Sequence, residues 1–201
     1  MPVLGLTGGI ATGKTTFAPL LLRHFSGMQH FDSDFCVHNL LGGDEAIRGA
    51  VLEAFGPAVM GEDGWPSRPK LREAVFADES RRRALEAILH PVVRASWRMK
   101  AATARADGSW LLVDIPLLYE TGVQSEFDRV IVVGCPRATQ LKRLNIERGL
   151  ALELAERIMA SQLAIGVKTQ QADHVIWNDS TVCNLDGQSE LLAAWLKQHC
   201  G

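Results

Sequence analysis

A glycine-rich segment near the amino terminus carries the most specific chemical signal in this sequence. Residues 8–15 read Gly-Gly-Ile-Ala-Thr-Gly-Lys-Thr, which matches the phosphate-loop pattern G-x-x-x-x-G-K-[ST]. In such a loop backbone N–H groups converge on phosphate oxygens, and glycine permits their close approach. Lys14 adds a charge that bridges the β- and γ-phosphates, and the Thr15 hydroxyl takes a place on Mg²⁺. The motif predicts a site for nucleotide phosphates and Mg²⁺ formed by Gly9, Ile10, Ala11, Thr12, Gly13, Lys14, Thr15 and Thr16. GTPases, ATPases and small-molecule kinases all use such a loop, so it identifies a nucleotide binder and not a reaction.

Carboxylates follow two other apolar runs, at the positions where strands are expected to end. Asp32 and Asp34 flank Ser33, and Asp114 closes the run Leu111-Leu112-Val113. A kinase needs a carboxylate that orients the acceptor hydroxyl and takes its proton, and we assign that role to Asp34. A helical pattern follows directly after Asp32 and Asp34, so one of the two acids is expected to cap that helix instead. Asp114 fits the role of an acid at the end of a strand that holds Mg²⁺. The alternative is that it is only a solvated residue where the strand ends.

A histidine precedes a proline within a helical stretch further along the chain. Pro91 predicts a break there, and the break would let His90 face the acceptor. A lone histidine more often has only a structural role. For His90, therefore, both a structural role and contact with the acceptor remain open.

The elements that position these residues alternate between strand and helix. Short apolar runs predict strands at 3–7, 29–32, 110–114, 129–134 and 174–177, with helical pattern between them. The helix after the phosphate loop begins near Lys14, is disturbed by Pro19 and ends at Gly27. This order predicts an α/β fold with a five-stranded parallel sheet flanked by helices.

Two helical stretches are too long for ordinary connections between strands. We expect one domain over 1–201 with a core of 1–43, 107–136 and 169–201, into which both stretches are inserted. Residues 44–106 would cover the acceptor. Residues 137–168 are rich in arginine and lysine and would form a lid over the phosphates.

Composition excludes several other classes of protein. The chain has 201 residues, 47% of them hydrophobic and 22% charged, and its net charge is −2. It therefore has no excess of positive charge for nucleic acid. The four cysteines lie far apart and suggest neither a zinc site nor a disulfide framework. Without an apolar run for a membrane span or a signal peptide, we expect a soluble cytoplasmic protein.

Taken together, these residues resemble the dephospho-CoA kinase family over nearly the whole chain. The matching segments are Gly5–Thr16, Asp32–Asp34, Phe55-Gly56 to Asp63-Gly64, Arg68, Leu71, Val75-Phe76, Leu89–Pro91, Pro116–Glu120, Gln140–Leu144, Arg148, Ser161-Gln162, Ala172–Ile176 and Asn178. The resemblance implies transfer of the ATP γ-phosphate to the ribose 3′-hydroxyl of dephospho-CoA, by a monomer or weak homo-oligomer. It implies that Asp34 is the base, that Arg143 and Arg148 belong to the lid over ATP, and that adenine lies near Asn178. Asp32, Arg68, His90 and Leu117 would contact the acceptor.

The chain departs from the family pattern at three places. Ala11-Thr12 stands where glycine and serine are common, which costs one loop position conformational freedom. Asp32-Ser33-Asp34 replaces the commoner D-A-D, and the turn at 177–180 is unusual.

Two other functions remain as alternatives. Shikimate kinases and nucleoside monophosphate kinases share the phosphate loop, but the Gly-Gly-Arg-Gly element of shikimate kinase is missing. A GTPase-like switch would need Asn-Lys-x-Asp, which is absent.

Overall fold

The computed structural model describes residues 1–200, apart from the side chains of residues 76 and 77, and it divides into two compact units. One unit comprises Met1–Phe31 and Ala101–Gly201, and the other comprises Asp32–Lys100. The Phe76 side chain, which belongs to the family resemblance, lies outside the described part.

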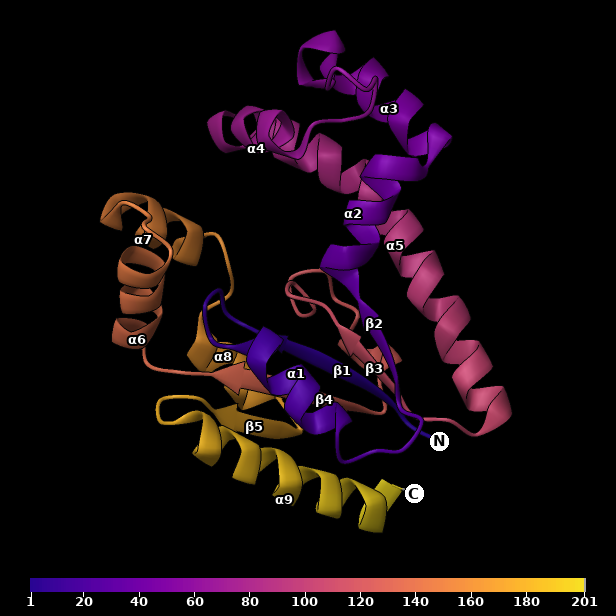
Figure 1. Ribbon diagram of the computed structural model, residues 1–201, viewed down its shortest axis with the longest axis vertical. Coiled ribbons are helices and arrows are strands. Elements are labelled where there is room, and N and C mark those ends of the chain that lie inside the picture. Colours follow the sequence, from indigo (N-terminus) through magenta and orange to yellow (C-terminus); the bar gives the residue numbers. More distant parts are fainter. Residues whose placement is uncertain (201) are drawn as a thin grey trace. The chain divides into compact units, whose positions relative to one another are not determined.

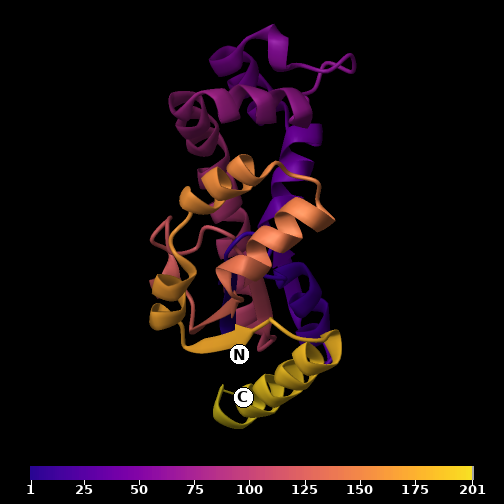
Figure 2. The ribbon, with the colours of Figure 1, turned by 90° about the vertical axis from the view of Figure 1, so that its left-hand side faces the viewer.

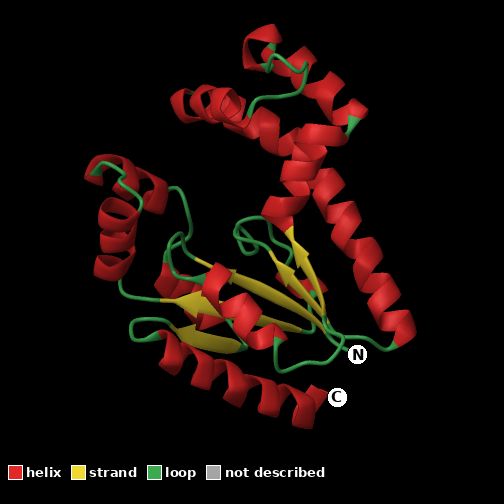
Figure 3. Cartoon of the chain, viewed as in Figure 1, coloured by secondary structure: helices red, strands yellow, loops and turns green. Residues whose placement is uncertain are grey.

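A parallel sheet organises the first unit (Figure 3). Its strands are β1 (Val3–Gly8), β2 (Gln29–Asp32), β3 (Leu111–Asp114), β4 (Arg129–Gly134) and β5 (His174–Trp177), in the order β2-β3-β1-β4-β5. β1 pairs in parallel with β3 on one side and β4 on the other, and β4 pairs in parallel with β5. All residues of the central strand β1 are buried, as expected for a sheet covered on both faces. The predicted five-stranded parallel sheet is confirmed, with strand positions that match the expected ones to within a residue or so.

Helices of the first unit cover the sheet (Figure 1). α1 (Lys14–Leu22) packs against α9 (Val182–Cys200), and both share a core with the strands. Phe17, Leu21 and Leu196 are fully buried in that core. The stretch 137–171 forms α6 (Arg137–Lys142), the π-helical turn η3 (Arg143–Glu147), α7 (Leu152–Ala160) and α8 (Ile165–Gln171), seen in orange in Figure 2. A short 3₁₀ turn, η2 (Gln124–Glu126), precedes β4.

The second unit is helical and has its own core. It contains α2 (Ser33–Gly43), α3 (Glu45–Phe55), the 3₁₀ turn η1 (Pro57–Val59), α4 (Arg68–Ala77) and most of α5 (Glu79–Asp107). Val51, Leu71 and Leu89 are among its buried residues. The turn at 61–65 is closed by a bridge between Met60 and Pro66.

Two expected helix boundaries are wrong. Pro91 does not break its helix, because α5 runs through it to Asp107. Proline removes one backbone hydrogen bond at a cost of about 3 kcal/mol, and burying Leu89, Val93 and Trp97 along one face offsets it at about 1.5–3 kcal/mol each. The other helix, α1, ends at Leu22 rather than at Gly27, because His24 N–H bonds to the Leu21 carbonyl and tightens the last turn.

His174 makes the sheet edge sensitive to pH. Its ring packs edge-on against Trp195, with 4.5 Å between centroids, and burial lowers its pKa. Because the unfolded chain binds a proton near pH 6.5 and the folded chain resists it, stability falls as the pH drops through that value.

We therefore expect the free energy of unfolding of the wild type to fall between pH 7.5 and pH 5.5, and that of His174→Phe to fall less. Urea unfolding of both proteins at the two pH values measures this. Equal pH dependence in the two proteins would contradict a His174 that is half-buried and stays neutral in the folded chain.

Candidate functional site

The phosphate loop lies between the end of β1 and the start of α1, where two glycines are needed for different reasons. A Cβ on Gly8 would collide with the Val133 carbonyl oxygen of the neighbouring strand β4. Gly13 has φ of +97°, a left-handed conformation that favours glycine, and a Cβ there would overlap the Asn178 amide. The chain can therefore turn from strand to helix here only with glycine at both positions.

Ala11 occupies a left-handed position without being glycine, with φ of +59°. This conformation costs an ordinary residue roughly 1–2 kcal/mol. The Ala11 side chain is buried in a small cluster with Leu144 of η3 and Ala155 of α7. Alanine stands at position 11 where glycine is common in the family, and its backbone strain is thus offset in part by packing against the 137–168 region.

The carbonyl groups of the loop all receive hydrogen bonds. The donors come from within the loop, from α1 and from four side chains that follow it far along the chain. They are Lys168 Nζ to Gly8 O (3.4 Å), Thr12 Oγ1 to Gly9 O (2.9 Å), Gln140 Nε2 to Ile10 O (2.7 Å), Arg143 Nη1 to Ala11 O (3.1 Å), Asn178 Nδ2 to Thr12 O (2.8 Å), and Phe17 N to Gly13 O (3.0 Å). With its carbonyls bound in this way, the loop has a defined orientation for its N–H groups.

Arg143 and Asn178 meet at this loop, as the nucleotide-site assignment requires. Arg143 Nη1 also lies 3.3 Å from Thr12 O, and its Nη2 donates to Asn178 O at 3.1 Å. Asn178 is buried directly after β5. Arg148 follows η3 and is exposed. Arg143 and Asn178 thus join the loop from two separate parts of the chain.

Oxygen donors suited to Mg²⁺ occur beside the loop. Thr15 lies in the first turn of α1 and is exposed, as is Thr16, and Lys14 begins that helix. Asp114 is buried at the end of β3, in register with Leu6 of β1. A hydroxyl and a carboxylate are hard ligands that fit Mg²⁺. Within the described residues no cluster of three or more His, Cys, Asp or Glu could hold a metal ion.

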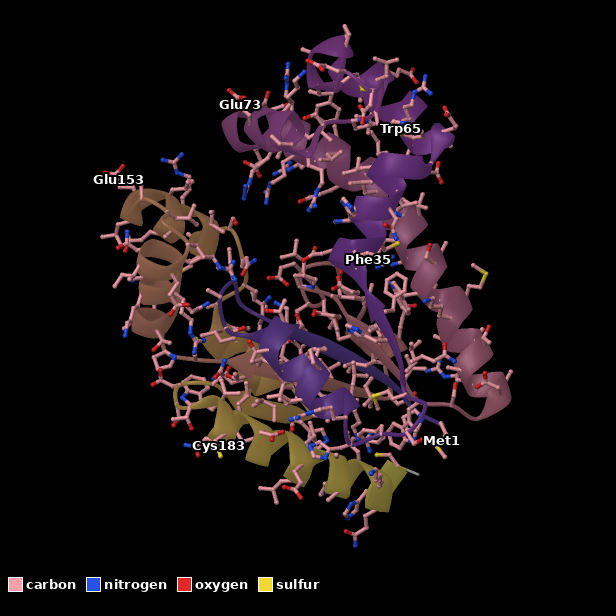
Figure 4. The ribbon with its side chains drawn as sticks, viewed as in Figure 1. Met1, Phe35, Trp65, Glu73, Glu153 and Cys183 are labelled. Carbon is pink, nitrogen blue, oxygen red and sulfur yellow. The ribbon has the colours of Figure 1, made fainter. Side chains whose placement is uncertain are left out.

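The expected acceptor residues lie mostly in the second unit. Asp32 caps α2 by accepting a hydrogen bond from Phe35 N at 3.0 Å, and Asp34 lies in the first turn of that helix. The side chain of Phe35, the next residue along α2, is exposed (Figure 4). Arg68 begins α4, with its Nη1 3.3 Å from His38 Nδ1.

The other two expected acceptor residues lie on different elements. His90 is exposed on α5, and Leu117 follows β3 in the first unit and is half-buried.

The cysteines are free thiols, as expected from their spacing. Cys183 lies at the start of α9 and is exposed (Figure 4), whereas Cys135 is buried after β4. Burial raises the pKa of the Cys135 thiol, although Arg143 acts in the opposite direction. Cys135 is therefore a protonated partner of Arg143 rather than a nucleophile, with its Sγ 3.8 Å from Nη1.

Three contacts of the loop were not predicted from the sequence. Lys168, Gln140 and Gln162 each bond to it, yet the sequence shows only cationic and polar residues in a helical stretch. Gln140 and Gln162 lie within segments of the family resemblance, which was the one available signal. Lys168 lies outside those segments.

Comparison with known proteins agrees with this geometry. The family model for dephospho-CoA kinase matches residues 2–184. A dephospho-CoA kinase of Symbiobacterium thermophilum is 39% identical over 202 residues, which cover 100% of this chain and 82% of that protein. One of Methylococcus capsulatus is 37% identical over 192 residues, covering 96% and 95%.

Solved structures show the same fold. A dephospho-CoA kinase from Campylobacter jejuni aligns with a TM-score of 0.66 at 25% identity, covering 97% of each chain. A shikimate kinase from Acinetobacter baumannii aligns with a TM-score of 0.56 at 18% identity, covering 100% of this chain and 96% of that one, and shares the fold alone. No helix within the described residues is long and apolar enough to cross a membrane. The chain belongs to the dephospho-CoA kinase family, and it is an ATP-dependent kinase that transfers phosphate to a hydroxyl group.

Proposed function

We propose that Lys14, Asp34 and Arg143 carry phosphoryl transfer from Mg²⁺-ATP to the ribose 3′-hydroxyl of dephospho-CoA. The observation that carries this proposal is the phosphate loop, whose carbonyls are all bound and which joins Arg143 and Asn178, in a chain of this family. Lys14 neutralises charge on the β- and γ-phosphates as the bond to the leaving ADP breaks. Asn178 contacts the adenine, and Arg148 closes over the phosphates with the 137–168 lid.

Thr15 and Asp114 are the proposed holders of Mg²⁺, Asp114 through water. When bound with ATP, the ion neutralises phosphate charge. The Thr15 hydroxyl and the Asp114 carboxylate orient it, and Lys14 supplies the remaining positive charge from the protein.

Asp34 is the proposed base. Its place in the first turn of α2 puts its carboxylate at the positive end of the helix dipole, which favours negative charge. The carboxylate takes the proton of the 3′-hydroxyl while the hydroxyl oxygen forms its bond to the γ-phosphorus and ADP leaves.

Four residues are proposed to hold the acceptor. Asp32 lies two residues before Asp34, Arg68 and His90 belong to the helical region 44–106, and Leu117 follows β3 in the first unit. We propose that the enzyme works in the cytoplasm as a monomer or weak homo-oligomer, with 44–106 covering the acceptor.

ADP release tests the acceptor directly. With Mg²⁺-ATP present, we expect release with dephospho-CoA and none above the blank with shikimate, gluconate or AMP. Lys14→Ala should abolish release while its circular dichroism spectrum remains that of the wild type, because Lys14 adds charge over the phosphates and lies outside the core. Release with another acceptor would overturn the substrate, and release in the blank would indicate an ATPase.

Asp34→Asn tests the base. The amide cannot take a proton, so we expect kcat to fall by roughly 10²–10⁴ with little change in the ATP dissociation constant. Asp32→Asn is the matched control for kcat, because asparagine also caps a helix: its kcat should stay within a few-fold of the wild type, and the loss of its proposed contact with the acceptor should appear in the KM for dephospho-CoA. Similar losses in both variants would refute a proton-transfer role specific to Asp34.

Arg143→Ala separates charge stabilisation from loop support. If Arg143 stabilises the transition state, kcat/KM should fall by more than the dissociation constant for ATP rises. Calorimetric titration with ATP and steady-state kinetics measure the two quantities. A parallel loss in both would mean that the side chain acts only by holding the carbonyls of Ala11 and Thr12.

A further inference from the structure

Lys168 is a fully buried cation beneath the phosphate loop. It lies on α8 with 0% of its side chain exposed. Its ammonium contacts Glu120 Oε1 at 2.8 Å, Pro116 O at 3.2 Å and Gly8 O at 3.4 Å. An ammonium has three donors, and three acceptors surround this one, two from the segment 116–120 after β3 and one from the end of β1.

Each of these acceptors is tied to a second element. Gly8 is the last residue of β1 and the first of the phosphate loop. Pro116 O, in the segment after β3, also accepts from Thr7 Oγ1 of β1 at 3.1 Å. Glu120 Oε1 also accepts from Leu163 N at 2.8 Å, at the point where the chain returns from the lid region. Lys168 therefore joins the loop, the segment after β3 and the end of the lid region.

The segment 162–168 contacts the loop at both of its ends. At the first end, Gln162 Oε1 accepts from Ile10 N at 2.8 Å, and at the other end lies Lys168. A cavity of about 370 Å³ borders Gly9 and is lined by Gln162 and Gly166, among other residues. Because this side of the loop borders open space, packing alone does not hold it, and the polar contacts must do so.

Stability alone is a weak reason for a buried ion pair here. Removing two charges from water costs about as much as their attraction returns, and apolar pairs of similar size are often equally stable. The contact with Gly8 O offers a different reason. The Gly8 carbonyl and the Gly9 N–H share one planar peptide and point in opposite directions, so holding the oxygen fixes the first N–H of the loop.

We propose that Lys168 is a positioning residue, which with Glu120 fixes the first peptide of the phosphate loop for nucleotide phosphates and couples it to the end of the lid region. The proposal rests on the proposed function of the loop as the ATP phosphate site. Lys168 itself touches no phosphate, because it is fully buried. Its effect is on phosphates specifically, and contacts to the nucleoside should not depend on it.

The test compares nucleotide binding with nucleoside binding. Lys168→Met keeps the length of the side chain and removes its charge. In the full chain we expect the dissociation constant for ADP and the KM for ATP to rise about ten-fold or more, and kcat/KM to fall at least as much. The dissociation constant for adenosine should stay within two-fold, and Lys197→Met, which removes a lysine that lies over the Phe25 ring, is the matched control with unchanged constants.

A second variant covers the case in which Lys168→Met fails to fold. Lys168→Met combined with Glu120→Gln removes both charges and keeps an oxygen acceptor for Leu163 N, and it should show the same selective loss for ADP. Glu120→Gln alone keeps an acceptor for the ammonium and should retain most of the ADP affinity. Circular dichroism melts report the folded fraction of each variant.

Two outcomes would overturn the proposal. In the first, a folded variant binds ADP as the wild type does, even with a lower melting temperature. In the second, ADP and adenosine lose affinity equally. These binding results do not depend on the acceptor, so a wild type that binds ADP but fails to phosphorylate dephospho-CoA would refute the proposed substrate and leave this test intact.

Discussion

The constraint on which this structure depends is the need to bind the carbonyl groups of a loop that is proposed to present several of its N–H groups to phosphate. A loop that turns its N–H groups toward one ligand directs many of its carbonyls elsewhere, and buried carbonyls without donors are costly. Here donors reach them from α1, from α6 and η3, from α8 and from the residue after β5. Much of the chain after β4 is thus engaged in holding eight residues near the amino terminus.

This requirement gives the cationic stretch after β4 a second role. The sequence suggests a lid whose arginines close over phosphates, and Arg143 instead donates to main-chain oxygens of the loop and of Asn178. The two roles are compatible, because a guanidinium has five N–H donors. Ala11 shows the same coupling in apolar form, since its strained conformation places its methyl group against Leu144 and Ala155.

The second unit follows a different principle. Its first two helices begin at carboxylates that bind backbone N–H groups, with Asp32 before α2 and Asp44 before α3. Asp32 caps the helix, and Asp34 lies two residues further on, in the first turn at the positive end of the same helix. The order of the two acids within three residues therefore separates their roles: Asp32 caps the helix and is proposed to contact the acceptor, and Asp34 is proposed to take the proton.

Much of the fold was predictable because its determinants are local. Apolar runs of strand length bounded by glycine or aspartate marked all five strands, and the loop motif marked the start of α1. The errors arose where distant packing outweighed local preference. Pro91 remains within α5 because the buried face of that helix offsets one missing hydrogen bond, and neighbouring residues alone do not show that burial.

For the candidate site, the sequence by itself determined which residue types bind phosphate and which acids follow the strands, because those depend on spacing within a few residues. Only the tertiary structure decided which side chains hold the loop. Lys168 lies 160 positions from Gly8, and Asn178 lies 166 positions from Thr12. Contacts over such separations depend on strand order, which brings β5 next to β4 and β4 next to β1. The sequence carries no local pattern for that order, so the support of the loop became visible only in the folded chain.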